Sequence, residues 1–352
     1  MRRGAVLAVP FALAALPAAF SAAPAAAAAT PQSGGGTPEA AEPEFRITDE
    51  RIAESSGLAA SRRHEGVYWT HNDSGAYGPE IYAVDEQGRT VATVTVTGDG
   101  VEARDWEAIA VGADEDGDPA VFVGDIGDNF QGGWPSIRVY RLPEPENLTD
   151  QTIGAATFTF VYEDGGRDAE AMMVDPRDNR LYVLSKEVAG GVYAAPKRLD
   201  PDGTTTLKRI DSAPLYATDA AFSPDGAYYA VRTYWAATVY DASDGVRGRI
   251  AERVPLPESD QGESLAFSHD GESLLAGTEG PGSPVWRMPL ETGVAGSGGG
   301  GGSPSGSGEE SAGEVEGGSG GEQNTGAAAL IWTGVGLAVV VIAGIALLAR
   351  RG

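Results

Sequence analysis

The run EAIAV at Glu107–Val111 recurs in altered form four more times along the chain, and this repetition decides the fold. Each copy begins with an acidic or small polar residue, followed by small or apolar residues. The other copies begin at Ser56, Glu170, Asp219 and Glu263, so successive copies are 51, 63, 49 and 44 residues apart. Self-similarity at this period is typical of folds built from repeated supersecondary units.

Each copy opens a series of short β-rich runs that are separated by Gly, Asp and Pro turns, with no long stretch of helical periodicity. The first four copies open four strands each and the fifth opens three. The predicted strands are 57–61, 67–71, 80–84, 90–97, 107–111, 120–124, 137–142, 156–162, 170–174, 180–184, 191–195, 204–210, 219–223, 228–233, 237–240, 249–254, 264–268, 273–277 and 284–288.

One further strand, at Phe45–Asp49, precedes the first copy and belongs to none. It supplies the strand that the fifth series lacks. We therefore predict an all-β fold, a β-propeller of five four-stranded blades closed by the N-terminal strand. A closed ring leaves only short, protected sheet edges. Six blades are the alternative count, and a β-sandwich is the alternative architecture.

Two turns and two strand starts carry a family resemblance. Phe222–Gly226 (FSPDG) and Phe267–Gly271 (FSHDG) resemble the turn after the first blade strand in TolB-type and WD40-like propellers. The starts at Glu107 and Glu170 resemble those of secreted phytase-like, or esterase-like, propellers. The resemblance implies a propeller over the folded part of the chain. Phytase-like propellers use channel acids to hold Ca²⁺, which in turn engages anionic substrates.

Composition excludes several classes of partner and cofactor. The 352-residue chain has no Cys and a formal net charge of −26. The lack of Cys rules out disulfides and thiolate-bound metals. A strongly acidic chain does not suit nucleic acid, whose phosphates require a basic surface. We expect no nucleotide or flavin.

The two ends predict export and anchoring. Residues 1–29 have the basic, apolar and small-residue regions of a signal peptide. A linker at 30–43 leads to the ectodomain at 44–292, and a Gly/Ser/Glu-rich flexible tether follows at 293–326. Residues 327–349 are uncharged and long enough to cross a bilayer as a helix, and 350–352 form a basic cytoplasmic tail.

These ends place the ectodomain outside the cell on a single-pass membrane protein, with the C-terminus in the cytoplasm. Attachment to a cell wall by a sortase is the minor alternative, because residues 322–326 (EQNTG) lack the Leu-Pro half of a sorting signal. The expected partners are the membrane, through the C-terminal helix, and envelope proteins or glycans. The sequence leaves the oligomeric state open.

A propeller brings the starts of its inner strands together around the mouth of its channel. Four carboxylates at such starts, Glu107, Glu170, Asp219 and Glu263, form the predicted metal site. Their mutual repulsion would be relieved by Ca²⁺, which takes about 6–8 oxygen ligands. Alternatively, these acids brace neighbouring blades through hydrogen bonds and Arg–carboxylate pairs, or two of them form a catalytic dyad.

Strand starts and loops at the same face supply the other site residues. His71 and Asp73 are candidates for catalysis, with a structural role for His71 as the alternative. The remaining residues, which are charged, polar or aromatic, are candidates for ligand binding, with packing between blades as the alternative for the aromatic ones. These are Arg104, Asp125, Asp128, Asn129, Phe130, Trp134, Arg167, Lys186, Arg232, Tyr234 and Trp235.

Three functions remain open at this level. The first is a surface module that binds a ligand or a protein, with Ca²⁺ in the channel. The second is a cation-dependent extracellular phosphoesterase or esterase of phytase-like type. The third is an assembly platform for an envelope complex. Whether the protein is an enzyme, and which ligand it takes, does not follow from the sequence.

Overall fold

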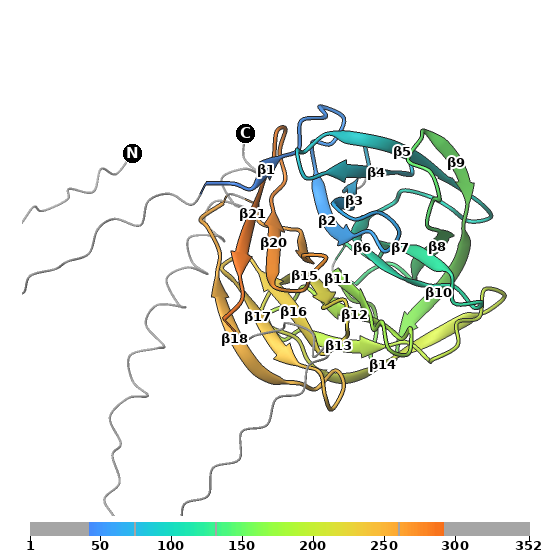
Figure 1. The fold of residues 1–352 in the computed structure, drawn as a ribbon. Coiled ribbons are helices and arrows are strands. Elements are labelled where there is room, and N and C mark those ends of the chain that lie inside the picture. The colour runs from blue at the N-terminus through green and yellow to red at the C-terminus, as the bar shows by residue number, and fades with distance from the viewer. Residues whose placement is uncertain (1–41, 74, 131, 260, 292–352) are drawn as a thin grey trace, which may run out of the picture. The chain divides into compact units, whose positions relative to one another are not determined.

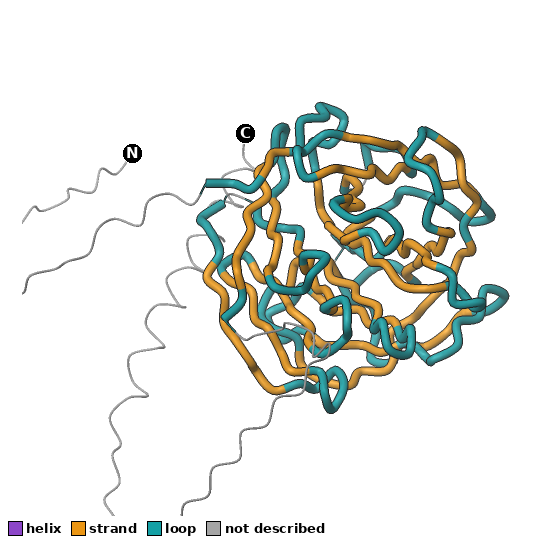
Figure 2. The backbone as a smooth tube through the Cα atoms, in the orientation of Figure 1, coloured by secondary structure: helices purple, strands orange, loops and turns teal. Residues whose placement is uncertain are grey.

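The computed structural model describes residues 42–291 except 74, 131 and 260. This part of the chain is all-β, with twenty-one strands and no helix (Figures 1 and 2). The predicted signal peptide, tether, membrane helix and cytoplasmic tail lie outside the described residues, as does most of the N-terminal linker. Within the described ranges no helix has the length and apolar character needed to cross a membrane.

The strands form four hydrogen-bonded sheets. The first sheet has the order β2 (Ser55–Ala60), β3 (Val67–Asn72), β4 (Glu80–Asp85), β5 (Thr90–Thr97) and β9 (Gln151–Gly154). A second has the order β15 (Ala217–Phe222), β16 (Tyr228–Thr233), β17 (Ala236–Asp241) and β18 (Arg249–Pro255). A third has the order β19 (Leu265–Phe267), β20 (Ser273–Gly277), β21 (Pro284–Pro289) and β1 (Phe45–Arg46).

The fourth sheet has eight strands because two antiparallel sets join at their outer edges. One set is β6 (Trp106–Ala113), β7 (Pro119–Asp125), β8 (Ile137–Pro143) and β10 (Ala156–Tyr162). The other is β11 (Ala169–Val174), β12 (Leu181–Ser185), β13 (Gly191–Ala194) and β14 (Thr204–Ser212). Strands β10 and β14 pair in parallel, from Thr159 opposite Thr204 to Tyr162 opposite Leu207.

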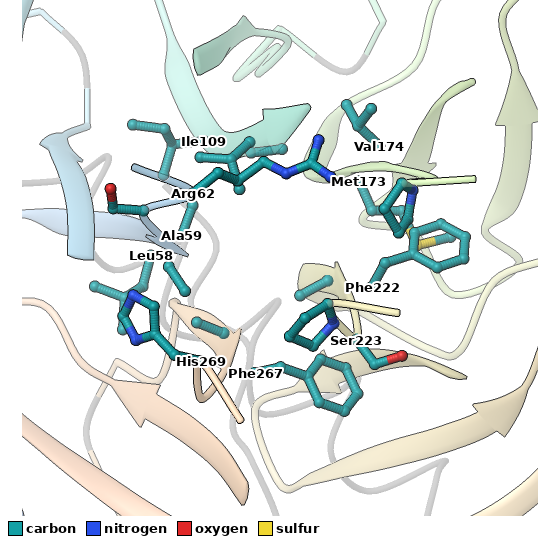
Figure 3. Close-up of a pocket in the computed structure, with 18 of the residues that line it drawn as sticks. Leu58, Ala59, Arg62, Ile109, Met173, Val174, Phe222, Ser223, Phe267 and His269 are labelled. Carbon is teal, nitrogen blue, oxygen red and sulfur yellow. The ribbon is translucent and has the colours of Figure 1, made fainter. Parts of the chain in front are cut away.

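The first strand of each set packs against the first strand of the next. Contacts run from β2 to β6, β11, β15 and β19, and β19 returns to β2, so these inner strands close a ring. Figure 3 shows them around a central cavity. All six residues of β11 (AEAMMV) are buried, whereas the outer strand β18 is mostly exposed. Short apolar residues allow the inner strands to approach one another, and the fold is β-propeller-like.

The predicted strands match most of the observed ones. The prediction that the N-terminal strand pairs with the last strand is confirmed: Phe45 lies opposite Val285, although β1 ends at Arg46 rather than Asp49. Strand β9 was not predicted. It covers β5 in parallel, with Val94 opposite Gln151.

The core lies between neighbouring sets and is reinforced by buried polar contacts. One apolar cluster, which includes Phe45, Tyr68 and Leu58, joins the set of β1 to that of β2. Another, which includes Trp69 and Trp106, joins the set of β2 to that of β6. Buried polar side chains need such partners because an unpaired one destabilises the fold.

Glu144 is one of these buried polar links. It follows β8, and its Oε1 accepts from Trp69 Nε1 at 2.8 Å and from Ser61 Oγ at 2.6 Å. Trp69 lies on β3 and Ser61 directly follows β2, so this carboxylate holds the sets of β2 and β6 together.

The contribution of β1 can be measured at a single side chain. Phe45 is 6% exposed and packs against Tyr68 with ring centroids 6.2 Å apart. Phe45→Ala should lower the free energy of unfolding by about 3–5 kcal/mol, because it leaves a cavity in the core. Arg46→Ala, on the exposed face of the same strand, is the matched control and should cost far less. Equal effects in denaturant unfolding would show that β1 is not part of the core.

Candidate functional site

Each of the first four inner strands begins with a β-bulge. The pairing register shifts between Ser55 and Gly57, Trp106 and Ala108, Ala169 and Ala171, and Ala217 and Asp219. A bulge leaves one residue outside the ladder and re-aims its side chain. The bulged residues are Ser56, Glu107, Glu170 and Thr218.

The positions of the bulges show that one strand start, Asp219, was aligned incorrectly with the other copies of the repeat. Asp219 lies opposite Arg232 in the ladder, so it corresponds to Ala108, and Thr218 corresponds to Glu107. The Phe-Ser-x-Asp-Gly turns contain the signal for this offset, because Glu263 lies four residues before Phe267 and Thr218 lies four before Phe222.

The side chain of Asp219 has a different environment from the other strand-start acids. Its Oδ1 accepts from Ala220 N at 2.8 Å, and its Oδ2 accepts from Leu265 N at 2.6 Å. Burial raises its pKa, and these backbone donors and Arg232 oppose the increase. Asp219 therefore links β15 to β19, which is the bracing role weighed as the alternative for these acids.

Three carboxylates meet at the start of β6. Ligand oxygens of Asp73, Asp105 and Glu107 all lie within 4.8 Å of one another. Asp73 directly follows β3, and Asp105 and Glu107 flank Trp106. The sequence placed Asp73 at this face as a catalytic candidate and did not assign Asp105 to the metal site. The sequence signal that could have indicated Asp105 is the Arg-Asp-x-Glu pattern, which occurs at 104–107 and again at 167–170.

Neighbouring groups hold these carboxylates in place. Ser56 Oγ donates to Glu107 Oε2 at 3.2 Å, and Asn129 Nδ2 lies 3.4 Å from both oxygens of Asp105. A Cβ at Gly127 would lie 2.7 Å from Asp105 Oδ2 and from Glu107 Oε1. Only glycine fits there, so the 127–129 segment is shaped to the acids.

A second group of charged side chains lies at the same end of the inner strands, which we call the channel mouth. Lys186 Nζ donates to Glu170 Oε1 and lies 5.1 Å from the centre of the Tyr234 ring. Glu170 is 7% exposed and Glu263 is 4% exposed, yet Oε2 of each has no hydrogen-bond partner among the described residues. Three predicted site residues, Glu170, Lys186 and Tyr234, thus come together.

Burial and mutual repulsion raise the pKa values of these acids. Burial, followed by the charge of Glu263, raises the pKa of Glu170 to about 9, against the opposing effect of Lys186. Burial raises the pKa of Glu107 well above its usual value, and Glu170, Asp73 and Asp105 add to the increase. Burial also raises the pKa of Glu263, although Lys186 and Arg232 lower it. A bound cation would favour the ionised forms.

His71 is fully buried at this face. Its Nδ1–H donates to Asn72 O at 2.8 Å, and its Nε2 has no partner in the described part of the chain. Burial lowers its pKa to about 4, so the imidazole is neutral at pH 7. A Cβ at Gly57 would lie 3.0 Å from Nε2. The ring is therefore packed between β2 and β6.

The loop after β7 presents aromatic side chains. Asp128 accepts from Phe130 N at 2.9 Å and from Trp134 N at 2.7 Å, which fixes the loop. Phe130 is 71% exposed and packs edge-to-face on Trp134, and the Arg104 guanidinium lies 4.5 Å from the centre of the Trp134 ring. In the loop after β16, Trp235 is 62% exposed. Phe130 and Trp235 are therefore exposed to solvent, whereas Trp134 is half-buried.

Asp125, another predicted ligand-binding residue, is bound to the chain itself. Asp125 is fully buried and accepts from Asp105 N at 2.9 Å and from the Tyr140 hydroxyl at 3.0 Å. Arg104 Nε lies 3.5 Å from Asp125 Oδ1. These contacts fix the backbone of Asp105 beside the carboxylate cluster.

Two predicted arginines are likewise held by neighbouring groups. Arg232, 1% exposed, donates through Nη1 to Ser264 O at 2.6 Å and to Gly277 O at 2.7 Å. Arg167 pairs with Glu187 at 3.2 Å and with Asp164 at 3.1 Å. Arg232 links β16 to the neighbouring set, and Arg167 connects loops at the rim.

Comparison with known proteins gives a limited result. No family model matches the chain, and no curated protein matches it. A solved structure of a gluconolactonase from Xanthomonas campestris is similar at 17% identity and a TM-score of 0.43, over 68% of this chain and 72% of that one.

The pH dependence of stability should reveal the acids of the channel mouth. Burial, followed by Glu263, Asp73 and Glu54, raises the pKa of Glu279 to about 7. A pKa raised on folding contributes stability that is present below pH 4.5 and is lost as the pH rises through 7. The Tm should therefore fall between pH 5 and 8. Glu279→Gln should reduce that slope, and the exposed Glu86→Gln should not. An unchanged slope in Glu279→Gln would contradict the assignment.

Proposed function

We propose that this protein is a cell-surface ligand-binding module that holds a divalent cation at its channel mouth. Ca²⁺ is the cation that we expect there. Asp73, Asp105 and Glu107 would be the ligands. The observation that carries the proposal is the convergence of their oxygens within 4.8 Å of one another. The unpartnered buried oxygens of Glu170 and Glu263 at the same mouth are a second, independent indication.

The chemistry of the donors favours a hard cation. Three carboxylates can supply up to about six oxygens, which approaches the 6–8 that Ca²⁺ takes. Like charges at this spacing cannot all ionise in a buried site without a compensating charge. The ammonium of Lys186 is bonded to Glu170. A divalent cation at this point would balance the charge of Asp73, Asp105 and Glu107.

The rim indicates how a ligand would bind. A Ca²⁺ ion held by one group of carboxylates keeps open positions for an anionic group of the ligand. The exposed rings of Phe130 and Trp235 offer flat surfaces that stack on sugar rings or anchor a peptide. We infer that the partners are acidic glycans or proteins of the cell envelope.

The architecture and location complete the proposal. We propose that the strand sets are five propeller blades, closed by β1, of the TolB/WD40-like and phytase-like kind. A signal peptide would export the chain, and the C-terminal helix would anchor it in the cell membrane with the propeller outside. The closed ring of inner strands supports the blade assignment.

A cation-dependent esterase or phosphoesterase is the second candidate. It is favoured by Glu170 and Glu263, two buried carboxyl groups with unpartnered oxygens beside Lys186. Two carboxyl groups in one site can serve as acid and base, and a nearby cation polarises a phosphoryl or carbonyl oxygen.

Cation binding should appear as thermal stabilisation of the full chain. At a hundred times its Kd, Ca²⁺ should add about 2.7 kcal/mol, and this raises the Tm by about 5–11 °C for a domain of this size. Asp105→Asn and Glu107→Gln should each remove the shift. Asp116→Asn, in an exposed acidic turn, is the matched control and should retain it. A shift of equal size with Mg²⁺, or one that survives Glu107→Gln, would contradict the Ca²⁺ site.

The two candidate functions separate in a turnover assay. A hydrolase should cleave members of a panel of carboxylic and phosphate esters only when Ca²⁺ is present. Glu263→Gln should then lower kcat by at least a hundredfold while the Ca²⁺-induced Tm shift remains. If no ester of the panel is cleaved while the Tm shift is retained, the hydrolase hypothesis is excluded and the ligand-binding function is supported.

A further inference from the structure

The channel has a second, chemically different end. The inner strands begin at the acidic mouth, and their last residues line a cavity of about 290 Å³ at the opposite end (Figure 3). Leu58, Ile109, Met173 and Phe267 are among the lining residues, together with several alanines. Because Asp73, Asp105 and Glu107 are not among them, this cavity is distinct from the proposed cation site.

The wall of the cavity is apolar, and its serines are already satisfied. Ser61 Oγ donates to Glu144 at 2.6 Å, and Ser223 Oγ donates to Asp225 at 2.7 Å. A cavity of roughly 150 Å³ with such walls binds benzene, so this one has room for about two fused rings.

Two basic side chains stand at its edge. Arg62 is exposed, and its guanidinium has no hydrogen bond or ion pair within the described residues, while its backbone N–H donates to Glu144 at 3.1 and 3.3 Å. His269 packs edge-to-face on Tyr68, and its Nε2 is buried with no partner in the described chain. Figure 3 shows Arg62 and His269 on the cavity wall. The buried Glu144 thus fixes the backbone of a cationic residue at an apolar cavity.

We propose that this cavity binds a small amphipathic anion, an aromatic carboxylate of about two rings. Its apolar body would fill the space between the inner strands, and its carboxylate would pair with Arg62. The chain carries a net charge of −26, but salt screens distant charges over about 8–10 Å, so the local guanidinium decides the sign of the ligand.

The test uses 2-naphthoate and its neutral analogue 2-naphthalenemethanol, with the full chain, in equilibrium dialysis. Both should bind, because the apolar body supplies most of the affinity. Arg62→Gln should weaken 2-naphthoate by about two- to fivefold, in keeping with an exposed ion pair, and leave the alcohol unchanged. Equal losses for both probes, or none for either, would overturn the role of Arg62.

Filling the cavity is the second arm. Ala60 and Ala221 line it and are partly exposed, so a larger side chain at either position enters the free space. Ala221→Leu and Ala60→Leu should each abolish binding of both probes while the Ca²⁺ response of the Tm is retained, which also shows that the variants fold. Binding that survives both substitutions, or no binding of either probe at 1 mM in the unaltered chain, would overturn the proposal.

Discussion

The β-bulge at the start of an inner strand is the constraint on which the channel mouth depends. In a regular strand, successive side chains alternate between the two neighbouring sets and pack there. The bulge removes Glu107 and Glu170 from that alternation and leaves each of them unpaired in the ladder. Without it these acids would have to be buried between sheets. The acids are thus placed by backbone geometry, and their protonation follows from burial.

The same axis carries two opposite environments because the inner strands change character along their length. Their starts hold carboxyl groups with Arg104, Lys186 and Arg232 among them, and their ends hold alanine and larger apolar residues around a cavity. A cation at the first end would release protons from the acids that it contacts, so its affinity rises with pH. Binding in the cavity at the other end would depend on the size and apolarity of the ligand.

Strand positions could be predicted from the sequence because short β-branched and aromatic runs alternate with turns. The deficit of one strand in the last series was enough to assign β1. Strand β9 (QTIG) has no such pattern, and its pairing with β5 depends on where the chain returns after β8.

The site was predicted less completely. The presence of acids at the mouth followed from the repeat, but the strand pattern itself does not show the extra residue of a bulge, so Asp219 was aligned in place of Thr218. Only the distance to the following Phe-Ser-x-Asp-Gly turn carries this offset. Arg232 was placed on the correct strand, whereas Asp125 was placed in the following loop and is the last residue of β7. Whether such a charge faces a ligand or a buried backbone group depends on neighbours that are distant in sequence, such as Tyr140 and Ser264.

The pairing of β10 with β14 has a consequence for how the molecule opens. The sets that begin with β6 and β11 share one hydrogen-bonded ladder, and β9 ties the first sheet to the segment that leads into β10. The sheet β15–β18 has no strand pairing to either neighbour. Thermal fluctuations can detach this sheet without breaking a ladder, so its amide protons should exchange through a partial opening. The amide protons of the sets that begin with β6 and β11 are exposed only when both sets open together.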